Sequence, residues 1–582
     1  MKKQVVDPEI LERAQQWLKP EFDKETRAAV KKLIAGNPNE LVDAFYKDLE
    51  FGTGGLRGVM GPGTNRMNRY TLGKATQGLA NYMLKAFKNQ PEIRVAIAFD
   101  SRNNSMPYAL TAAEILTANG IWVYLFEALR PTPQLSFAIR AFKCQGGLVI
   151  TASHNPKEYN GYKVYWDDGA QIVPPHDENI IAEVNKISSV SEVKFEGNHN
   201  LIKVIGSEID EIYLNTLSSL SLSPAENLKH QNIKIVYTPI HGTGVDLVPK
   251  ALHKFGFASV VTIPEQNVID GNFPTVESPN PEEPATLKLA LAKAKKIDAD
   301  IVMATDPDAD RVGIGIKDNM GKFILLNGNQ AAALLIHYVL TKWSEKRWLT
   351  GNEYIVKTIV TSNLLADIAS DFNVECKEVL TGFKYIAEVI RLNERNKVFI
   401  AGGEESYGYL VGSFVRDKDA VLSCAMFAEI VAWAKEQGKS VYQILIELYA
   451  KYGLYHEKLV SITRKGKEGA DEIKKMMQDF RTSPPKQLGG SDVVVINDYL
   501  KQQSYKLKES QILSIKLPKS DVIQFITEDG SRVSIRPSGT EPKIKFYFGV
   551  KSGMKYPAEY ELMKSKLDDK IAKIVEDLGV KK

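Results

Sequence analysis

Hydrophobic positions along the chain follow a strand and helix order that recurs three times. Short apolar runs predict buried strands, and between them apolar residues recur at helical spacing. The predicted strands are 94–99, 122–126, 147–150, 233–237, 260–263, 300–303, 354–360, 374–380 and 398–400, and the clearest helices are 106–119, 245–255 and 283–295. This alternation predicts three α/β domains with mostly parallel or mixed sheets.

The two ends of the chain have different patterns. From about Tyr455 the sequence predicts a hairpin at 522–526 and 533–535, a strand at 543–550, and a helix with apolar residues from Leu562 to Leu578. We interpret this part as a smaller α+β domain. The first fifty residues predict an amphipathic helical extension with a packing role. The expected domains are 1–205, 206–325, 326–454 and 455–582.

Composition narrows the class of protein. A chain of 582 residues is too long for one core and suggests three to five domains. The net charge of +4 is small, and no basic block indicates nucleic acid as a partner. The scattered cysteines Cys144, Cys376 and Cys424 fit a reducing cytosol. No signal peptide or membrane-spanning run is visible. We therefore expect a cytoplasmic protein.

A polar loop follows the last predicted strand of each α/β stretch. These loops are 151–155, 305–311 and 402–408. Open α/β sheets bind ligands beyond the carboxyl ends of their strands. We therefore expect the three loops to converge on one cleft.

The first loop presents Ser153 in an ordered turn after a buried strand, because Asn155-Pro156 and Asn160-Gly161 are turn dipeptides. A capping role for the serine is the structural alternative. The second loop places Asp306, Asp308 and Asp310 at alternate positions. Such carboxylates repel one another unless a cation lies between them, and hard oxygen ligands suit Mg²⁺.

Two other interpretations of the aspartate loop fit the sequence less well. An EF-hand fails on spacing, because its sixth position would be Arg311 and its twelfth Lys317. A solvated acidic turn fits poorly with the buried strand before it.

The third loop offers Glu404 and Ser406 as groups that bind hydroxyls. A fourth motif, Arg536-Pro-Ser-Gly-Thr-Glu-Pro542, has the composition of a phosphate cradle, with an Arg, two hydroxyls and a glycine that frees backbone N–H groups. A simple β-turn is the alternative for this motif.

Together, the four motifs resemble those of the α-D-phosphohexomutases, the phosphoglucomutase and phosphomannomutase superfamily. The segment Thr151-Ala-Ser-His-Asn-Pro-Lys-Glu-Tyr-Asn-Gly-Tyr-Lys is similar to the phosphoserine loop of that family, and the resemblance extends from about residue 50 to 550. It implies a heart-shaped molecule of four domains, three similar α/β domains and a smaller α+β domain. It also implies a reversible intramolecular phosphoryl transfer on sugar phosphates.

The resemblance implies roles for individual residues. Ser153 would carry the phosphate, and its phosphate would hold Mg²⁺ together with Asp306, Asp308 and Asp310. Lys163 would do acid/base work with a pKa lowered by nearby cations, and His154 is a possible helper. The remaining implied residues are Arg57 in the active site and, for substrate, Arg311, Thr381, Gly382, Glu404, Ser406, Lys418, Arg536, Ser538, Gly539 and Thr540.

The expected reaction interconverts glucose 1-phosphate and glucose 6-phosphate through glucose 1,6-bisphosphate, because the Glu-Glu-Ser variant is closer to phosphoglucomutases. Phosphomannomutase and phosphopentomutase activity remain open. So do two other classes, a phosphatase-like phosphotransferase with Asp306 as nucleophile and a non-catalytic sugar-phosphate sensor. The sequence does not predict the oligomeric state.

Overall fold

The computed structural model describes residues 6–52, 54–464, 466–538 and 543–580. The chain divides into two compact units. The first unit comprises Met1–Gly315, Ala387–Leu392 and Gly408–Glu429, and the second comprises Ile316–Ile386, Asn393–Tyr407 and Ile430–Lys582. The division passes through the elements β10 (Val312–Lys317), α15 (Phe383–Asn393) and α16 (Ala420–Glu436).

The first unit begins with three short helices and continues into a mixed six-stranded sheet. The strand order is β1-β5-β4-β2-β3-β6, with β2, β3, β4 and β6 parallel and β5 and β1 antiparallel to their neighbours. The elements are α1 (Pro8–Gln16), α2 (Lys24–Ala35), α3 (Pro38–Phe45), β1 (Gly55–Val59), α4 (Arg69–Ala86), β2 (Arg94–Phe99), α5 (Ser105–Ala118), β3 (Trp122–Phe126), α6 (Thr132–Ala141), β4 (Gly146–Ile150), β5 (Tyr159–Trp166), α7 (His176–Lys186), η1 (Val190–Glu192), η2 (His199–Leu201) and β6 (Ile202–Ile205).

A second sheet of the first unit is built on parallel strands. β7 pairs with β8 on one side and with β9 on the other. β9 is buried at every position, as expected of a strand with helices on both faces of its sheet. The elements of this part of the first unit are α8 (Ser207–Ser218), α9 (Pro224–Lys229), β7 (Ile235–Thr238), α10 (Gly244–Lys254), β8 (Val260–Thr262), α11 (Pro264–Asn267), α12 (Lys288–Ile297) and β9 (Ile301–Thr305). The short strand β15 (Tyr409–Val411) comes later in the chain and is not a strand of this sheet.

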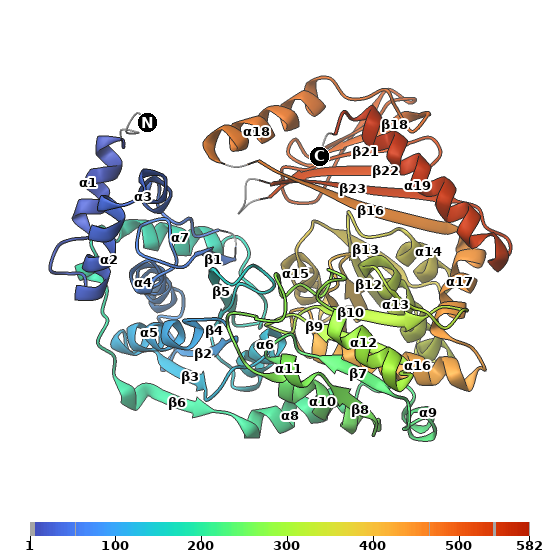
Figure 1. Ribbon diagram of the computed structural model, residues 1–582, viewed down its shortest axis with the longest axis horizontal. Helices are drawn as coiled ribbons and strands as arrows, with labels where there is room; N and C mark the ends of the chain where they lie inside the picture. The colour runs from blue at the N-terminus through green and yellow to red at the C-terminus, as the bar shows by residue number, and fades with distance from the viewer. Residues whose placement is uncertain (1–5, 53, 465, 539–542, 581–582) are drawn as a thin grey trace. The chain divides into compact units, whose positions relative to one another are not determined.

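The N-terminal helices have a hydrophobic core of their own. Trp17 stacks on Phe22 with ring centroids 4.7 Å apart, and Phe45 and Tyr70 meet Trp17 edge-on. Tyr70 belongs to α4, so this core attaches α1, α2 and α3 to the six-stranded domain (Figure 1). The sequence prediction of an amphipathic helical extension is confirmed.

In the second unit, a parallel sheet comes first. β12 lies between β13 and β14 and is parallel to both. The elements are α13 (Gly328–Glu345), β12 (Glu353–Thr358), α14 (Leu364–Asp371), β13 (Glu375–Val379), β14 (Val398–Gly403) and α17 (Val441–Tyr452). The short strand β11 (Phe323–Leu325) precedes them in the chain and is not a strand of this sheet. The third predicted strand and helix repeat is therefore confirmed.

The C-terminal part of the second unit is an eight-stranded sheet, whose main path runs β16-β23-β22-β21-β18-β19-β20 with β17 paired to β18. The strand pairs described for it are antiparallel, and helices α18 and α19 pack on the sheet (Figure 1). The elements are β16 (Leu454–Thr463), α18 (Gly466–Thr482), β17 (Gln487–Leu488), β18 (Ser491–Asp498), β19 (Gln503–Lys506), β20 (Gln511–Ser514), β21 (Ile523–Thr527), β22 (Arg532–Pro537), β23 (Lys543–Ser552), η3 (Pro557–Glu559) and α19 (Tyr560–Asp577).

Most predicted elements match the observed ones within two residues, and the predicted α+β character of the C-terminal part is confirmed. The largest shift concerns the helix predicted at 283–295, which is observed as α12 at Lys288–Ile297. The three cysteines are free. In the described part of the chain, no helix combines the length and the apolar character needed to cross a membrane.

Candidate active site

Ser153 lies in the loop that follows β4. Its backbone φ is +51°, in the left-handed region, which is uncommon for a residue with a side chain. The amide of Ser153 donates to Thr151 Oγ1 at 2.8 Å, and its own Oγ donates to Asp306 Oδ2 at 2.6 Å. His154 Nδ1 lies 3.1 Å from the same oxygen. The serine hydroxyl therefore faces the aspartate loop.

A close backbone approach fixes the position of the serine loop. β5 passes so near that a Cβ on Gly161 would lie 2.4 Å from the carbonyl oxygen of Thr151. Only glycine avoids this clash. In the antiparallel pair of β1 and β5, Arg57 lies opposite Gly161, and Lys163 lies opposite Gly55. The sheet register therefore brings Arg57 and Lys163 to neighbouring strands.

Asp306, Asp308 and Asp310 form a compact cluster between β9 and β10. All three are buried, and one ligand oxygen of each lies within 4.8 Å of the others. The outer oxygens Asp308 Oδ1 and Asp310 Oδ1 are buried without a hydrogen-bond partner among the described residues. Buried anionic oxygens without donors are costly, and a hard cation satisfies them. The donor set fits Mg²⁺.

The three carboxyl groups titrate differently. Burial, reinforced by Asp308 and Asp310, raises the pKa of Asp306 well above its usual range. Burial also acts to raise the pKa of Asp308 and Asp310, but nearby lysines overcome it and both pKa values are lowered. Lys163 acts on both carboxyl groups, and Lys418 acts on Asp310. The cluster therefore stays anionic.

Lys163 contacts the aspartate cluster directly. Its Nζ lies 2.7 Å from Asp308 Oδ2 and 3.5 Å from Asp310 Oδ2. Burial acts to lower the pKa of Lys163, but these two carboxylates more than offset burial and the pKa is raised. The sequence expectation of a pKa lowered by cations is therefore not met, because the carboxylates outweigh Lys418 in the structure.

Lys418 is brought to the same cluster although it is more than 100 residues away in the sequence. Its Nζ lies 3.2 Å from Asp310 Oδ2 and 3.2 Å from Asp417 Oδ1. Asp417 is held in turn by Tyr165, whose hydroxyl donates to it at 2.6 Å. A chain of contacts from β5 therefore orients Lys418.

Two further predicted residues of the first unit contact the serine and aspartate loops or their neighbours. Arg57 Nη1 lies 3.5 Å from Asn155 Oδ1, beside the serine loop. Arg311 Nη1 donates to Glu282 Oε1 at 2.5 Å, and its Nε lies 3.8 Å from Asp310 Oδ1. The guanidinium of Arg311 is thus engaged by acidic side chains.

Arg102 is a residue of the site that the sequence prediction missed. It is 3% exposed, and its guanidinium donates to the backbone carbonyls of Ser153, Asn155, Pro156 and Tyr159. The sequence signal was present, since Asp100-Ser-Arg102 follows β2, whose carboxyl end lies beside that of β4.

Asp100 completes this support. It accepts hydrogen bonds from the Arg102 amide at 2.9 Å and from Thr151 Oγ1 at 2.6 Å. Since Thr151 accepts from the Ser153 amide, the chain of bonds ends at the serine itself. We call Asp100, Arg102 and Thr151 the loop clamp.

In the second unit, Glu404 lies at the end of β14. It is buried, and its Oε1 accepts a hydrogen bond from the Gly382 amide at 2.9 Å. Gly382 has a φ of +123°, which favours glycine. The neighbouring Thr381 has a buried hydroxyl without a hydrogen-bond partner among the described residues. The structure thus brings Thr381, Gly382 and Glu404 together, and Ser406 follows in the same turn.

Glu405, in the same turn, is held by hydrogen bonds from two threonine hydroxyls. Its Oε2 accepts from Thr358 Oγ1, at the end of β12, at 3.2 Å and from Thr361 Oγ1, in the loop after β12, at 3.0 Å. Burial, reinforced by Glu404, raises the pKa of Glu405 to about 7.

The predicted phosphate cradle is described only in part. Arg536 lies on β22, and the Ser538 amide donates to the Lys543 carbonyl at 2.7 Å. Gly539 and Thr540 lie outside the described residues. The structure therefore tests neither as a ligand.

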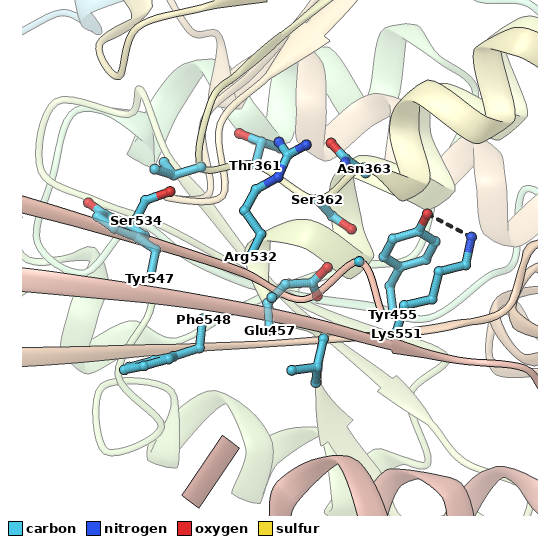
Figure 2. A pocket seen from close by; sticks show the side chains of 14 residues that line it. Thr361, Ser362, Asn363, Tyr455, Glu457, Arg532, Ser534, Tyr547, Phe548 and Lys551 are labelled. Carbon is cyan, nitrogen blue, oxygen red and sulfur yellow. Dashed lines mark hydrogen bonds between the residues drawn. The ribbon is translucent and has the colours of Figure 1, made fainter. Parts of the chain in front are cut away.

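The second unit also contains a small cavity of about 40 Å³ between the loop after β12 and strands β16, β22 and β23. Figure 2 shows Glu457 pointing into it below Arg532 and Ser362. Glu457 Oε1 is buried without a hydrogen-bond partner among the described residues. Burial raises the pKa of Glu457 to about 7.

Comparison with known proteins identifies the family. Models of the phosphoglucomutase/phosphomannomutase family match in chain order, with α/β/α domains I, II and III at 48–191, 211–321 and 327–452 and the C-terminal domain at 464–555. A phosphoglucomutase of Staphylococcus haemolyticus (strain JCSC1435) is 37% identical over 511 residues, which cover 87% of this chain and 91% of the relative.

Two solved structures share the fold. A phosphoglucomutase/phosphomannomutase family protein from Burkholderia thailandensis has a TM-score of 0.65 at 19% identity, covering 91% of this chain and 97% of its own. Parafusin, a phosphoglucomutase from Paramecium in its open form, has a TM-score of 0.66 at 19% identity, covering 92% and 96%. The predicted four-domain α/β architecture is confirmed. The chain belongs to the phosphoglucomutase/phosphomannomutase family of the α-D-phosphohexomutase superfamily.

Proposed function

We propose that this protein is a phosphoglucomutase that interconverts glucose 1-phosphate and glucose 6-phosphate through a phosphoserine and glucose 1,6-bisphosphate. One observation carries the proposal. The Ser153 hydroxyl lies 2.6 Å from a carboxylate oxygen of a buried cluster whose donor set fits Mg²⁺. A nucleophile beside a hard-cation site is what phosphoryl transfer requires. The 37% identity to phosphoglucomutases supports glucose as the sugar.

The proposed reaction transfers one phosphoryl group in each of two steps. In the first, the bond between Ser153 Oγ and phosphorus breaks while a hydroxyl oxygen of the sugar phosphate bonds to that phosphorus. In the second, the bisphosphate has turned round, and its other phosphoryl group returns to Ser153 Oγ. In the first step the sugar hydroxyl loses one proton and Ser153 Oγ gains one, and in the second step this proton transfer is reversed. The phosphoserine enzyme is therefore regenerated after both steps.

Charged residues around Ser153 suit this chemistry. We assign the proton relay to Lys163, with His154 as a second group because its Nδ1 lies 3.1 Å from Ser153 Oγ. Arg57, Arg311 and Lys418 are proposed to bind phosphoryl oxygens. Mg²⁺ held by Asp306, Asp308, Asp310 and the serine phosphate would neutralise negative charge on the transferring group.

The second unit is proposed to recognise the substrate. Glu404 and Ser406 would hold sugar hydroxyls, with Thr381 and Gly382 beside them. The orphaned Thr381 hydroxyl and the fixed Glu404 carboxylate support this assignment. Arg536 and Ser538 would bind the phosphate that is not reacting, and Gly539 and Thr540 remain predictions for the same role. The domain limits 1–205, 206–325, 326–454 and 455–582 and a cytoplasmic location are also retained from the sequence.

Replacing the serine tests the function. Ser153→Ala should abolish turnover of glucose 1-phosphate in a coupled assay and keep the melting temperature within about 2 °C, because a loop hydroxyl contributes little to stability. Ser219→Ala, at an exposed serine of the same unit, should keep full activity. Mass spectrometry should find an acid-stable phosphate on Ser153 after incubation with glucose 1,6-bisphosphate.

Each contrary outcome identifies another class. Retained activity in Ser153→Ala with an acid-labile phosphate on Asp306 would indicate the phosphatase-like class. Binding of sugar phosphate without turnover in the native chain would indicate a sensor. Faster turnover of mannose or ribose phosphates would indicate phosphomannomutase or phosphopentomutase activity.

A further inference from the structure

A cavity of about 570 Å³ lies in the first unit between the N-terminal helices and the six-stranded domain. Its walls come from the turn between α1 and α2, the loop after α3, the first turns of α4, the end of α7 and the loop that follows α7. Its volume is within the range of small-molecule sites. None of the residues assigned above to phosphoryl transfer lines it. The matching family model begins only at residue 48, so one wall belongs to a segment outside that model.

The inner wall of the cavity is apolar and aromatic. Trp17 and Phe22 come from the turn between α1 and α2, Phe51 from the loop after α3 and Tyr70 from α4, and all four are less than 10% exposed. The Tyr70 hydroxyl donates to Asp23 at 2.6 Å, so its polar end is satisfied and the ring remains as apolar surface. A ligand with an apolar ring or chain would lose contact with water here.

The charged side chains around the cavity favour an anion. Two of the three acids already have cationic partners, since Asp48 pairs with Arg13 and Glu50 with Lys47 at 3.1 Å. The third acid, Glu21, is exposed on the rim.

The two lysines of the lining are Lys19, on the N-terminal segment, and Lys74, on α4. Neither forms an ion pair with any residue that the structure describes. Lys74 has an electrostatic interaction with Glu192. The pKa of Glu192 is lowered mainly by hydrogen bonds from Ser188 and Ser189, and Lys74 makes a smaller contribution to this lowering. Among the lining residues themselves, two lysines and one acid are therefore left without an ion pair, so the unpaired charge of the lining is positive.

We propose that this cavity binds a small amphipathic organic anion, with an apolar ring system against Trp17 and Tyr70 and one anionic group near Lys19 and Lys74. The N-terminal helices thereby form half of a ligand site as well as a packing layer. Ring stacking and charge act on different parts of the ligand, so binding should require both parts.

A fluorescent anion of this chemistry tests the proposal with the full chain. 8-Anilinonaphthalene-1-sulfonate should bind with one site per chain and receive energy from Trp17, so Trp17→Phe should reduce the sensitised emission. Lys74→Ala should weaken binding at least about fivefold, in keeping with the loss of one partly buried ion pair. Lys88→Ala, at an exposed lysine beyond α4, should leave the affinity unchanged.

Two further measurements separate this site from general hydrophobic binding. Leu49→Trp should place an indole ring in the cavity and weaken binding, with circular dichroism as the check of folding. The neutral analogue N-phenyl-1-naphthylamine should bind at least about fivefold more weakly than the sulfonate. Equal binding of both dyes, several sites per chain, or an unchanged affinity in Lys74→Ala would overturn the proposal, even if Leu49→Trp failed to fold.

Discussion

Arg102 donates a hydrogen bond from Nη2 to the backbone carbonyl oxygen of Ser153 at 2.6 Å. The same guanidinium binds three more carbonyls of the loop and faces the ring of Phe273 at 5.1 Å. A planar group with five donors can hold several carbonyls at once, which a lysine cannot do. The left-handed backbone of Ser153 is therefore held by residues outside the serine motif.

Arg102→Lys tests this support. The charge opposite Asp100 remains while most carbonyl contacts are lost, so we expect kcat to fall about 10- to 100-fold with little change in KM, because misplacing the nucleophile weakens transition-state contacts. Steady-state kinetics and the rate of Ser153 phosphorylation by glucose 1,6-bisphosphate measure the effect.

Arg130→Lys is the matched control for that variant. Arg130 forms a bidentate ion pair with Asp210 in the same unit, at 2.8 and 2.9 Å, and none of the side-chain contacts described for it is with the serine loop. The Arg130→Lys variant should have a lower melting temperature than the wild type but no selective loss of kcat. Equal kcat in the Arg102→Lys variant and the wild type would show that the loop holds its shape without the clamp.

Removal of metal should stop turnover. Treatment with EDTA should reduce activity to background, and Mg²⁺ should restore it, because the anionic cluster needs a cation to accept a phosphoryl group. Asp308→Asn removes one charged ligand and should weaken Mg²⁺ affinity at least about tenfold, measured by the Mg²⁺ dependence of rate and by calorimetry.

Asp246→Asn, an exposed aspartate paired with Lys250 at 2.6 Å, should leave the Mg²⁺ dependence unchanged. Full activity in chelator-treated enzyme would assign the protein to a metal-independent class of phosphotransferase.

Glu404→Gln should lower kcat/KM on every sugar phosphate by about 10- to 100-fold while Ser153 phosphorylation remains possible. Glutamine keeps a carbonyl oxygen for the Gly382 amide but loses the charge that strengthens hydrogen bonds to hydroxyls. Glucose 1-phosphate should be the best substrate, mannose 1-phosphate slower, and ribose 1-phosphate possible, because adjacent equatorial 3- and 4-hydroxyls fit paired groups in both orientations of the sugar.

A panel of these three substrates measures that specificity, with Glu509→Gln on the surface of the second unit as the control. Better turnover of ribose 1-phosphate than of glucose 1-phosphate, or unchanged rates in Glu404→Gln, would refute the sugar assignment.

Glu457 should make stability depend on pH. Burial raises its pKa from 4.5 to about 7, against a smaller opposing hydrogen bond from Ser362, so the folded state binds the proton more tightly than the unfolded state. Folding stability from this group is therefore present below about pH 4.5 and is lost as pH rises towards 7. Glu457→Gln removes that loss.

The melting temperature of Glu457→Gln relative to wild type should accordingly be higher at pH 8 than at pH 5 by at least about 2 °C. Glu561→Gln, at an exposed glutamate of the same unit, should show the same difference from wild type at both pH values. An equal offset for Glu457→Gln at both pH values would mean that the carboxyl is solvated in the cavity of Figure 2.

Local sequence determined the elements and the individual motifs. Strands such as β2 and β3 have the predicted ends, because buried strands with helices on both faces are continuous apolar runs. The aspartate loop was recognisable because three adjacent like charges need a common partner. The three aspartates lie within five residues of one another in the chain, so the sequence alone shows both their spacing and their shared need for a cation.

Tertiary structure decided which distant groups meet. Ser153 and Asp306 come from different sheets, and Lys418 reaches Asp310 from more than 100 residues away, which no periodicity reveals. The raised pKa of Lys163 depends on the two carboxylates that the fold places beside it. Arg102 was missed because, although Asp100-Ser-Arg102 visibly follows a predicted strand, no residue pattern shows that its partners are the backbone carbonyls of the serine loop. Pair distances and burial, rather than residue types, determine these properties, and both exist only in the folded chain.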